Sequence, residues 1–195
     1  MACGVFRPAL EALRSDGRLP LFETVFLPSA LHLDPARLRQ RLEEALGERR
    51  PSERVLCLYG GCVPDMDALC HRHGAARPPG GHCYEMLLGS RRYAALIAEC
   101  PGTYFVDQGL VAHFDDRCWE PLGLEDERVR EACFGRYERL LYVRQPGDPE
   151  LSEQLGEIAA RLGLRLAIED ADYAELEENL LRLMDAPLLA TLTLV

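Results

Sequence analysis

Lysine is absent from this chain of 195 residues, and all 22 of its basic residues are arginine. The absence excludes mechanisms that need a lysine amine, such as Schiff-base catalysis and phosphate binding by a P-loop lysine. Positive charge is also scarce beside 32 acidic residues, which gives a formal net charge of -10 at pH 7. Nucleic-acid binding requires clustered cationic surface, so we expect no nucleic-acid partner.

The chain also lacks long apolar runs. No stretch approaches the roughly 20 apolar residues of a membrane-spanning helix, and residues 1–4 lack the charged and apolar regions of a secretion signal. We therefore expect a cytoplasmic protein with no membrane partner.

The common catalytic motifs are also missing from the sequence: a G-x-S-x-G elbow, a Walker A loop, a G-x-G-x-x-G loop and an H-E-x-x-H helix. The commonest hydrolase, nucleotide-binding and protease activities therefore have no support in the sequence.

What is present is the composition of an ordinary globular protein, with 48% hydrophobic and 28% charged residues. A chain of this length is long enough to bury a core without disulfide bonds. We expect a single α/β domain over residues 1–195, or two lobes that divide it at about 1–115 and 116–195.

Short apolar runs alternate with amphipathic segments along the chain. The expected strands are residues 2–6, 21–27, 54–59, 103–106, 140–143, 164–168 and 188–195. The expected helices are residues 8–13, 35–46, 64–70, 83–97, 125–139, 149–162 and 172–184, with a loop at 74–81 and an irregular segment at 119–124. The alternation predicts an α/β fold with a mainly parallel sheet, helices on both of its faces and Rossmann-like layers.

Eight cysteines are present in a chain without secretory targeting, which favours free thiols or metal ligands over a disulfide framework. Five of them lie mostly within periodic apolar stretches and are expected in the core: Cys57, Cys70, Cys100, Cys118 and Cys133.

The other three, Cys3, Cys62 and Cys83, have different positions. Cys3 and Cys62 each follow a predicted strand and precede a helix, and Cys83 stands at a helix start after a glycine-rich loop. Loops at the carboxyl ends of parallel strands meet at one edge of a sheet, and a helix amino terminus favours a thiolate. We therefore expect one site where the three thiolates bind zinc, an iron–sulfur cluster or another soft metal. The alternative is three buried structural thiols.

Further residues beside these cysteines are candidates for binding a cofactor. His32 and His82 are candidate extra ligands, and Tyr59-Gly60-Gly61 brings a flexible backbone close to Cys62. The simpler interpretation of the two glycines is a turn between a strand and a helix.

Several short segments in the first 105 residues resemble one protein family. They are ACGVFRP (2–8), LH (31–32), DP (34–35), LYGGC (58–62), HC (82–83), LLGS (87–90), Tyr93 and PGTYF (101–105). On these segments the chain resembles the DUF1638 family of uncharacterised bacterial and archaeal proteins. The resemblance implies an association with corrinoid-dependent methyltransferases, and it points to the same three cysteines.

Three hypotheses follow. The first is a metal- or metallocofactor-binding protein that assists corrinoid-dependent methyl transfer, with a corrinoid protein or a methyltransferase as partner, and with His32 and Tyr59 orienting a ligand. The second is a metal-dependent methyltransferase that acts on a small methylated substrate or on a corrinoid, with its acidic C-terminal half contacting a partner. The third is a non-catalytic binding module with structural cysteines.

Overall fold

The computed structural model describes residues 1–48, 50 and 53–185. The strand predicted at 188–195 lies outside the described residues. Strands and helices alternate along most of the described chain, and each strand pair there is parallel. The predicted α/β class is therefore confirmed, although the strands form several small sheets and not one broad sheet. None of the described helices is long and apolar enough to cross a membrane.

The first strands form a parallel array in the N-terminal lobe. They are β1 (Ala2–Cys3), β2 (Phe26–Leu27), β3 (Val55–Leu56) and β4 (Ala75–Ala76), in the pairs β1-β2 and β3-β4. The chain after β3 also bonds to β1, because the Cys3 amide donates to the Leu58 carbonyl at 3.1 Å and the Leu58 amide donates to the Met1 carbonyl at 2.9 Å. The spatial order is thus β2, β1, β3, β4.

A second parallel sheet forms the other lobe. Its strands are β5 (Thr103–Val106), β6 (Arg139–Arg144) and β7 (Arg165–Asp170), with β6 in the middle. Residues 140–143 of β6 are all buried, as a central strand covered on both faces requires.

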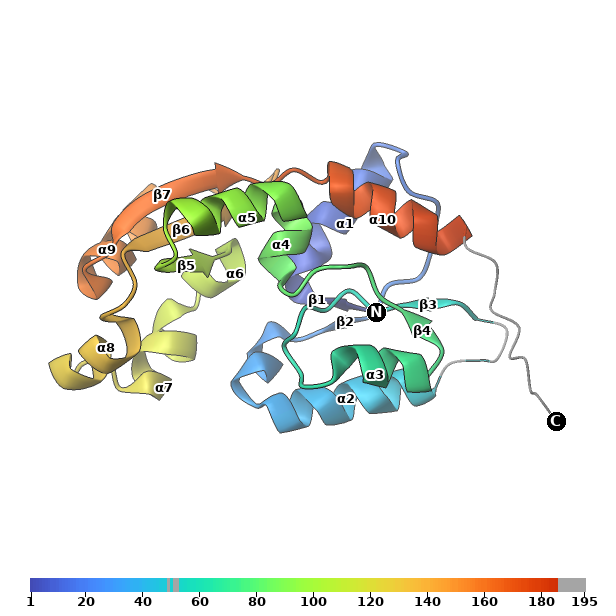
Figure 1. The fold of residues 1–195 in the computed structure, drawn as a ribbon, viewed down its shortest axis with the longest axis horizontal. Coiled ribbons are helices and arrows are strands. Elements are labelled where there is room, and N and C mark those ends of the chain that lie inside the picture. Colours follow the sequence, from blue (N-terminus) through green and yellow to red (C-terminus); the bar gives the residue numbers. More distant parts are fainter. Residues whose placement is uncertain (49, 51–52, 186–195) are drawn as a thin grey trace.

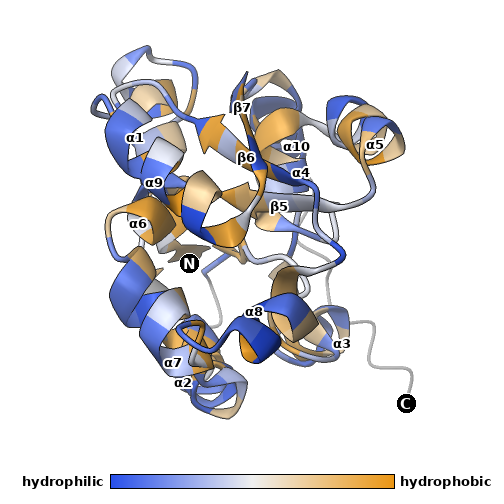
Figure 2. Cartoon of the chain, turned by 90° about the vertical axis from the view of Figure 1, so that its left-hand side faces the viewer, coloured by the Kyte–Doolittle hydropathy of each residue, from blue (hydrophilic) through white to orange (hydrophobic). Residues whose placement is uncertain are grey.

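Helices follow most of the strands. They are α1 (Arg7–Ser15), α2 (Pro35–Gly47), α3 (Met66–Arg72), α4 (Cys83–Leu88), α5 (Ser90–Glu99), α6 (Gln108–Val111), α7 (Glu120–Leu122), α8 (Glu127–Phe134), α9 (Ser152–Leu162) and α10 (Ala174–Asp185). Short helical turns are η1 (Gly4–Phe6), η2 (Ser29–Leu33) and the π-helical η3 (Asp115–Trp119). Hydrophilic and hydrophobic residues share helices such as α5, as amphipathic segments should (Figure 2).

The start of α2 illustrates how the sequence determines a helix. Asp34 accepts a hydrogen bond from the Arg37 amide at 3.0 Å, and Pro35 occupies the first turn. The apolar positions Leu38, Leu42 and Leu46 are all buried on one face. This helix and its cap were predicted.

Two clusters of buried apolar residues fill the described part of the chain. One fills the first lobe and continues onto the second sheet through Phe105, Leu141 and Val143, and the other lies around β5 and β6 with α9. Figure 1 shows β5, β6 and β7 grouped apart from β1, β2, β3 and β4. Helix α10 returns to the first lobe, where Leu176 and Leu180 join the first cluster.

The predicted helix 83–97 is wrong at one point, because the chain breaks between α4 and α5. Gly89 adopts a φ of 78°, a conformation that suits glycine. The next residue, Ser90, donates from its amide and its hydroxyl to the Glu175 carboxylate at 2.9 and 2.7 Å. The Glu175 carboxylate on α10 therefore caps the amino terminus of α5 and stabilises a second helix that begins at Ser90.

Several other expectations are corrected. The strand predicted at 2–6 ends at Cys3, and the helix predicted at 125–139 ends at Phe134. The strand predicted at 21–27 is reduced to Phe26–Leu27, and Leu21 is 97% exposed. The loop predicted at 74–81 contains β4, whose short side chains gave little strand signal. The segment 119–124, predicted to be irregular, contains the end of η3 and α7.

Gln145 joins the two lobes. Its side chain is buried, its Nε2 donates to the Val5 carbonyl at 3.0 Å, and its Oε1 accepts from the Tyr173 hydroxyl at 3.0 Å. Tyr173 is buried and Val5 is half-buried, so this amide joins the end of β6 to the chain that follows β1 in a region largely shielded from water.

We expect Gln145→Ala to lower the free energy of unfolding by about 2 kcal/mol, because it leaves buried polar groups without partners. Urea unfolding followed by circular dichroism measures the change. Gln40→Ala on exposed α2 is the matched control and should change stability by less than about 0.5 kcal/mol. An equal effect of the two substitutions would contradict the role of Gln145.

Candidate functional site

Four strands of the first lobe end at one edge, and each leads to a side chain that can bind a soft metal. Cys3 ends β1, and Cys62 follows the run that begins with β3. His32 lies in η2 after β2, and Cys83 begins α4 after β4. The parallel arrangement thus places three thiols and an imidazole at the carboxyl edge of the array, where ligands of α/β proteins usually bind.

These four side chains line one cavity of about 470 Å³. Part of its lining comes from the second lobe and follows the carboxyl ends of β5 and β6, with Asp107, Gln108 and Gln145 among its residues. Both lobes therefore present the same ends of their strands to one space. The volume lies within the usual range of small-molecule sites, about 300–1,000 Å³.

Glycines hold two of the cysteine loops together. The Gly61 amide donates to the Gly81 carbonyl at 2.7 Å. A Cβ on Gly60 would lie 2.9 Å from the Gly81 carbonyl oxygen and 2.9 Å from the Cα of His82. Only a residue without a Cβ permits this approach, which brings Cys62 and Cys83 toward each other.

His32 lies against Cys3 and is supported by Tyr59. The Cys3 Sγ is 3.8 Å from the His32 Nε2. The Tyr59 ring stacks on the imidazole, with 6.4 Å between ring centroids. The buried Tyr59 hydroxyl donates to the Ala2 carbonyl at 3.4 Å, so the tyrosine ties the histidine to β1.

Two of the thiols favour the thiolate. Hydrogen bonding from Cys83 lowers the pKa of Cys62 to about 4, against desolvation, with a further lowering by His32. The same interaction with Cys83 lowers the pKa of Cys3 to about 6, again with a contribution from His32. At neutral pH both sulfurs are therefore largely ionised.

The other two groups favour their protonated forms. Hydrogen bonding to Cys3 and then to Cys62 raises the pKa of Cys83 well above its ordinary value of 9.0. The same two sulfurs raise the pKa of His32 to about 10, although burial opposes the shift. The site at neutral pH is thus two thiolates stabilised by one thiol and one imidazolium.

A hydrogen-bonded pair, Tyr84 and Asp107, also lines the cavity. The Tyr84 hydroxyl donates to Asp107 Oδ2 at 2.9 Å, and Asp107 Oδ1 accepts from the Gly109 and Leu110 amides at 2.8 and 3.1 Å. Burial raises the pKa of Tyr84, so it remains a hydroxyl. Sequence reasoning missed this pair, although the position of Asp107 directly after β5 was a usable signal.

Not all residues predicted to bind a cofactor reach the cavity surface. His32 lines it, whereas Tyr59 and Gly60 are buried behind it, and Gly61 is exposed outside the lining. His82 also lines the cavity and packs against the Tyr93 ring, with 6.0 Å between centroids.

The remaining cysteines are mostly structural, as expected, with one correction. Cys57, Cys70, Cys100 and Cys118 are buried, but Cys133 is exposed on α8. All eight cysteines are free thiols.

Within the described chain, no set of three or more His, Cys, Asp or Glu side chains is arranged as a ready metal site. The thiols are therefore brought to one cavity without the close spacing that a bound ion imposes. Metal binding by Cys3, Cys62 and Cys83 stays a prediction.

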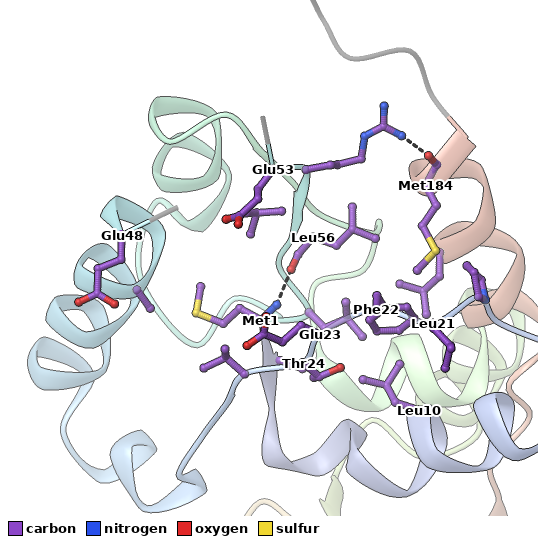
Figure 3. Close-up of a pocket in the computed structure, with 18 residues that line it drawn as sticks. Met1, Leu10, Leu21, Phe22, Glu23, Thr24, Glu48, Glu53, Leu56 and Met184 are labelled. Carbon is purple, nitrogen blue, oxygen red and sulfur yellow. Dashed lines mark hydrogen bonds between the residues drawn. The ribbon is translucent and has the colours of Figure 1, made fainter. Parts of the chain in front are cut away.

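A larger cavity of about 710 Å³ lies at the opposite, amino end of the first-lobe strands. Figure 3 shows Leu10, Leu21, Phe22 and Met184 around it, with the Met1 ammonium donating to the Leu56 carbonyl at 2.8 Å. Its lining is largely aliphatic and contains no cysteine or histidine. The thiol cavity is therefore the better candidate for chemistry.

Chemically, the lining of the thiol cavity offers soft anionic sulfur donors together with a carboxylate and a tyrosine hydroxyl. Thiolates bind soft metals and attack electrophiles. The carboxylate adds oxygen acceptors for a small polar molecule in the cavity.

Comparison with protein families finds a match over residues 26–180 to a family described as "Protein of unknown function (DUF1638)". No curated protein and no solved structure matches the chain.

We expect the folded, metal-free protein to show strong ultraviolet thiolate absorption at pH 7 that decreases in steps near pH 6 and pH 4, the pKa values of Cys3 and Cys62. On unfolding at pH 7 the absorption should fall, because both pKa values return toward 9.0. His32→Ala should move both steps to higher pH, since the stabilising imidazolium is lost. Cys133→Ser, outside the cavity, should leave the steps unchanged. A titration without thiolate below pH 8 would contradict the proposed charge state.

We expect Gly60→Ala to destabilise the fold by about 1–3 kcal/mol, because the new methyl group meets backbone atoms that cannot move independently. Gly156→Ala in α9 has nothing within 4 Å of its Cβ and should instead stabilise the helix by up to about 1 kcal/mol. Urea unfolding of both variants measures whether the free energy of unfolding changes in opposite directions. Equal stability of the two variants would show that the close approach of the two loops at Gly60 is not required for stability.

Proposed function

The chain belongs to the DUF1638 family, and we propose that it binds a soft metal ion or metallocofactor through Cys3, Cys62 and Cys83. The bound group would serve corrinoid-dependent methyl transfer. The observation that supports this proposal most strongly is the convergence of the three thiols and His32 on one cavity. Scattered structural cysteines would have no reason to share a cavity with a histidine.

The charge state of the site suits a soft cation. Two sulfurs are ionised near neutral pH, so two of the donors need no deprotonation. A divalent ion would displace the proton of Cys83, and a histidine that bound as a fourth ligand would lose its proton too. Binding should therefore release protons and should weaken as the pH falls. It would also draw the sulfurs closer than they lie in the metal-free protein.

His32 and Tyr59 have supporting roles in this proposal. With three sulfurs bound, His32 either completes a tetrahedral S₃N set or leaves a position open for a substrate. The Tyr59 ring beneath the imidazole restricts its orientation in both cases. When bound, zinc would supply Lewis acidity that lowers the pKa of a substrate thiol or water.

The cavity volume bears on how a corrinoid would take part. A space of about 470 Å³ suits a small molecule, and a corrinoid is larger than that. A corrinoid would therefore be presented by a partner protein, with only its reactive face near the thiols.

The second candidate function is a metal-dependent methyltransferase that acts on a small methylated substrate. The Tyr84–Asp107 pair favours it, because this pair adds polar groups to the cavity lining that would position such a substrate. Both candidate functions use the same metal site. They differ in whether the protein itself catalyses methyl transfer.

The test is anaerobic purification followed by metal analysis and absorption spectroscopy, after loading with zinc or with iron and sulfide. We expect about one metal ion or cluster per chain, at least tenfold weaker binding in Cys62→Ser and Cys83→Ser, and a loss of about 10–100-fold in His32→Ala. Cys133→Ser is the matched control and should bind like the parent protein.

If the protein binds as much metal after all three cysteines are replaced by serine, the proposed metal site is refuted. Zinc, iron–sulfur and corrinoid contents are distinguished by the spectrum. Demethylation of a methylated corrinoid, or of a small substrate, by the loaded protein alone would favour the enzyme over the accessory protein.

A further inference from the structure

We propose that Cys62 and Cys83 form a redox modification site, in which an oxidant of the peroxide class joins the two sulfurs in a disulfide. The disulfide would withdraw two of the three sulfurs from metal binding. This consequence for the metal rests on the proposed function, whereas the disulfide itself does not.

The backbone geometry favours this pair. Cys62 directly follows Gly61, whose amide donates to the Gly81 carbonyl at 2.7 Å, and Cys83 lies two residues beyond Gly81. Gly60 is in contact distance of the Cys83 amide nitrogen, since a Cβ there would lie 3.0 Å from it. The two loops are thus fixed to each other within a residue or two of both cysteines, which keeps the two side chains near each other, as a disulfide requires.

Cys62 and Cys83 are the more accessible of the three cysteines that line the cavity. Cys62 and Cys83 are both partly exposed and line the cavity, which a molecule of peroxide size can enter. Cys3 is only 3% exposed, and Cys57 and Cys70 are buried outside the cavity lining. The first sulfur to be oxidised should therefore have an accessible partner beside it.

The chemistry balances with hydrogen peroxide as the oxidant. One thiol sulfur attacks a peroxide oxygen, the O–O bond breaks, and the products are a sulfenic acid and water. The second thiol sulfur attacks the sulfenic sulfur, the S–OH bond breaks, and the hydroxyl leaves with the thiol proton as a second water. The two sulfurs together lose two electrons, and the peroxide gains them. A dithiol reductant reverses the reaction by exchange.

Metal binding and disulfide formation exclude each other, because both use the same sulfur electrons. A loaded site would protect Cys62 and Cys83 from peroxide. Oxidation of the empty site would leave Cys3 and His32, which are too few donors for a stable site.

The test treats the full-length metal-free protein, reduced under anaerobic conditions, with stoichiometric hydrogen peroxide. Remaining thiols are then alkylated, and the linked peptides are mapped by mass spectrometry. We expect a Cys62–Cys83 link that a dithiol removes. Cys62→Ser and Cys83→Ser should lose it, and Cys133→Ser should retain it. Circular dichroism checks that each variant is folded, and the peptide map of the parent protein is decisive if a variant is not.

A dominant link between any other pair, or oxidation to sulfinic acid without a link, would overturn the proposal. Zinc-loaded protein should form the link at least tenfold more slowly, and oxidation should release zinc to a chromogenic chelator. A protein that forms the link but binds no metal would refute the proposed function while leaving the modification site in place. A protein that binds zinc but never forms the link would refute the modification site while leaving the proposed function in place.

Discussion

The hydrogen bond from the Gly61 amide to the Gly81 carbonyl closes the gap between the two loops on which Cys62 and Cys83 stand. It forms only because Gly60 has no side chain, since a Cβ there would overlap the opposite backbone. Parallel pairing then aligns these loops with the ends of β1 and β2, which supply Cys3 and His32. The thiol cavity is thus a consequence of two glycines and of strand direction, more than of any local metal-binding motif.

Interactions among the cavity thiols explain the unusual acidity within this cavity. The three thiols cannot all ionise in a partly buried space, so the negative charge lies on Cys3 and Cys62, while the Cys83 proton remains and stabilises both. The His32 imidazolium balances part of the charge. A cation that entered would replace protons already held by the site, which links metal affinity to pH.

The second lobe completes the cavity, and its contribution depends on a few long-range contacts. Gln145 bridges Val5 and Tyr173, and Asp107 receives the Tyr84 hydroxyl from the neighbouring helix. Each contact joins residues far apart in the chain. The thiols and the polar groups of the second lobe are therefore held together by these hydrogen bonds and by the buried apolar cluster that both lobes share.

By itself, the sequence determined the α/β class, the capped helix α2, the strand β6, the positions of Cys3 and Cys62 after strands and the position of Cys83 at a helix start. These features depend on local periodicity and on residues that are neighbours in the chain. It did not determine the break at Gly89, since the carboxylate that caps α5 comes from Glu175 on α10. It also did not reveal β4, whose two alanines become a strand only through pairing with β3. The Tyr84–Asp107 hydrogen bond and the charge state of the thiols were likewise decided by the tertiary structure. Hydrogen bonding and burial depend on groups that are distant in the chain and become adjacent only after folding.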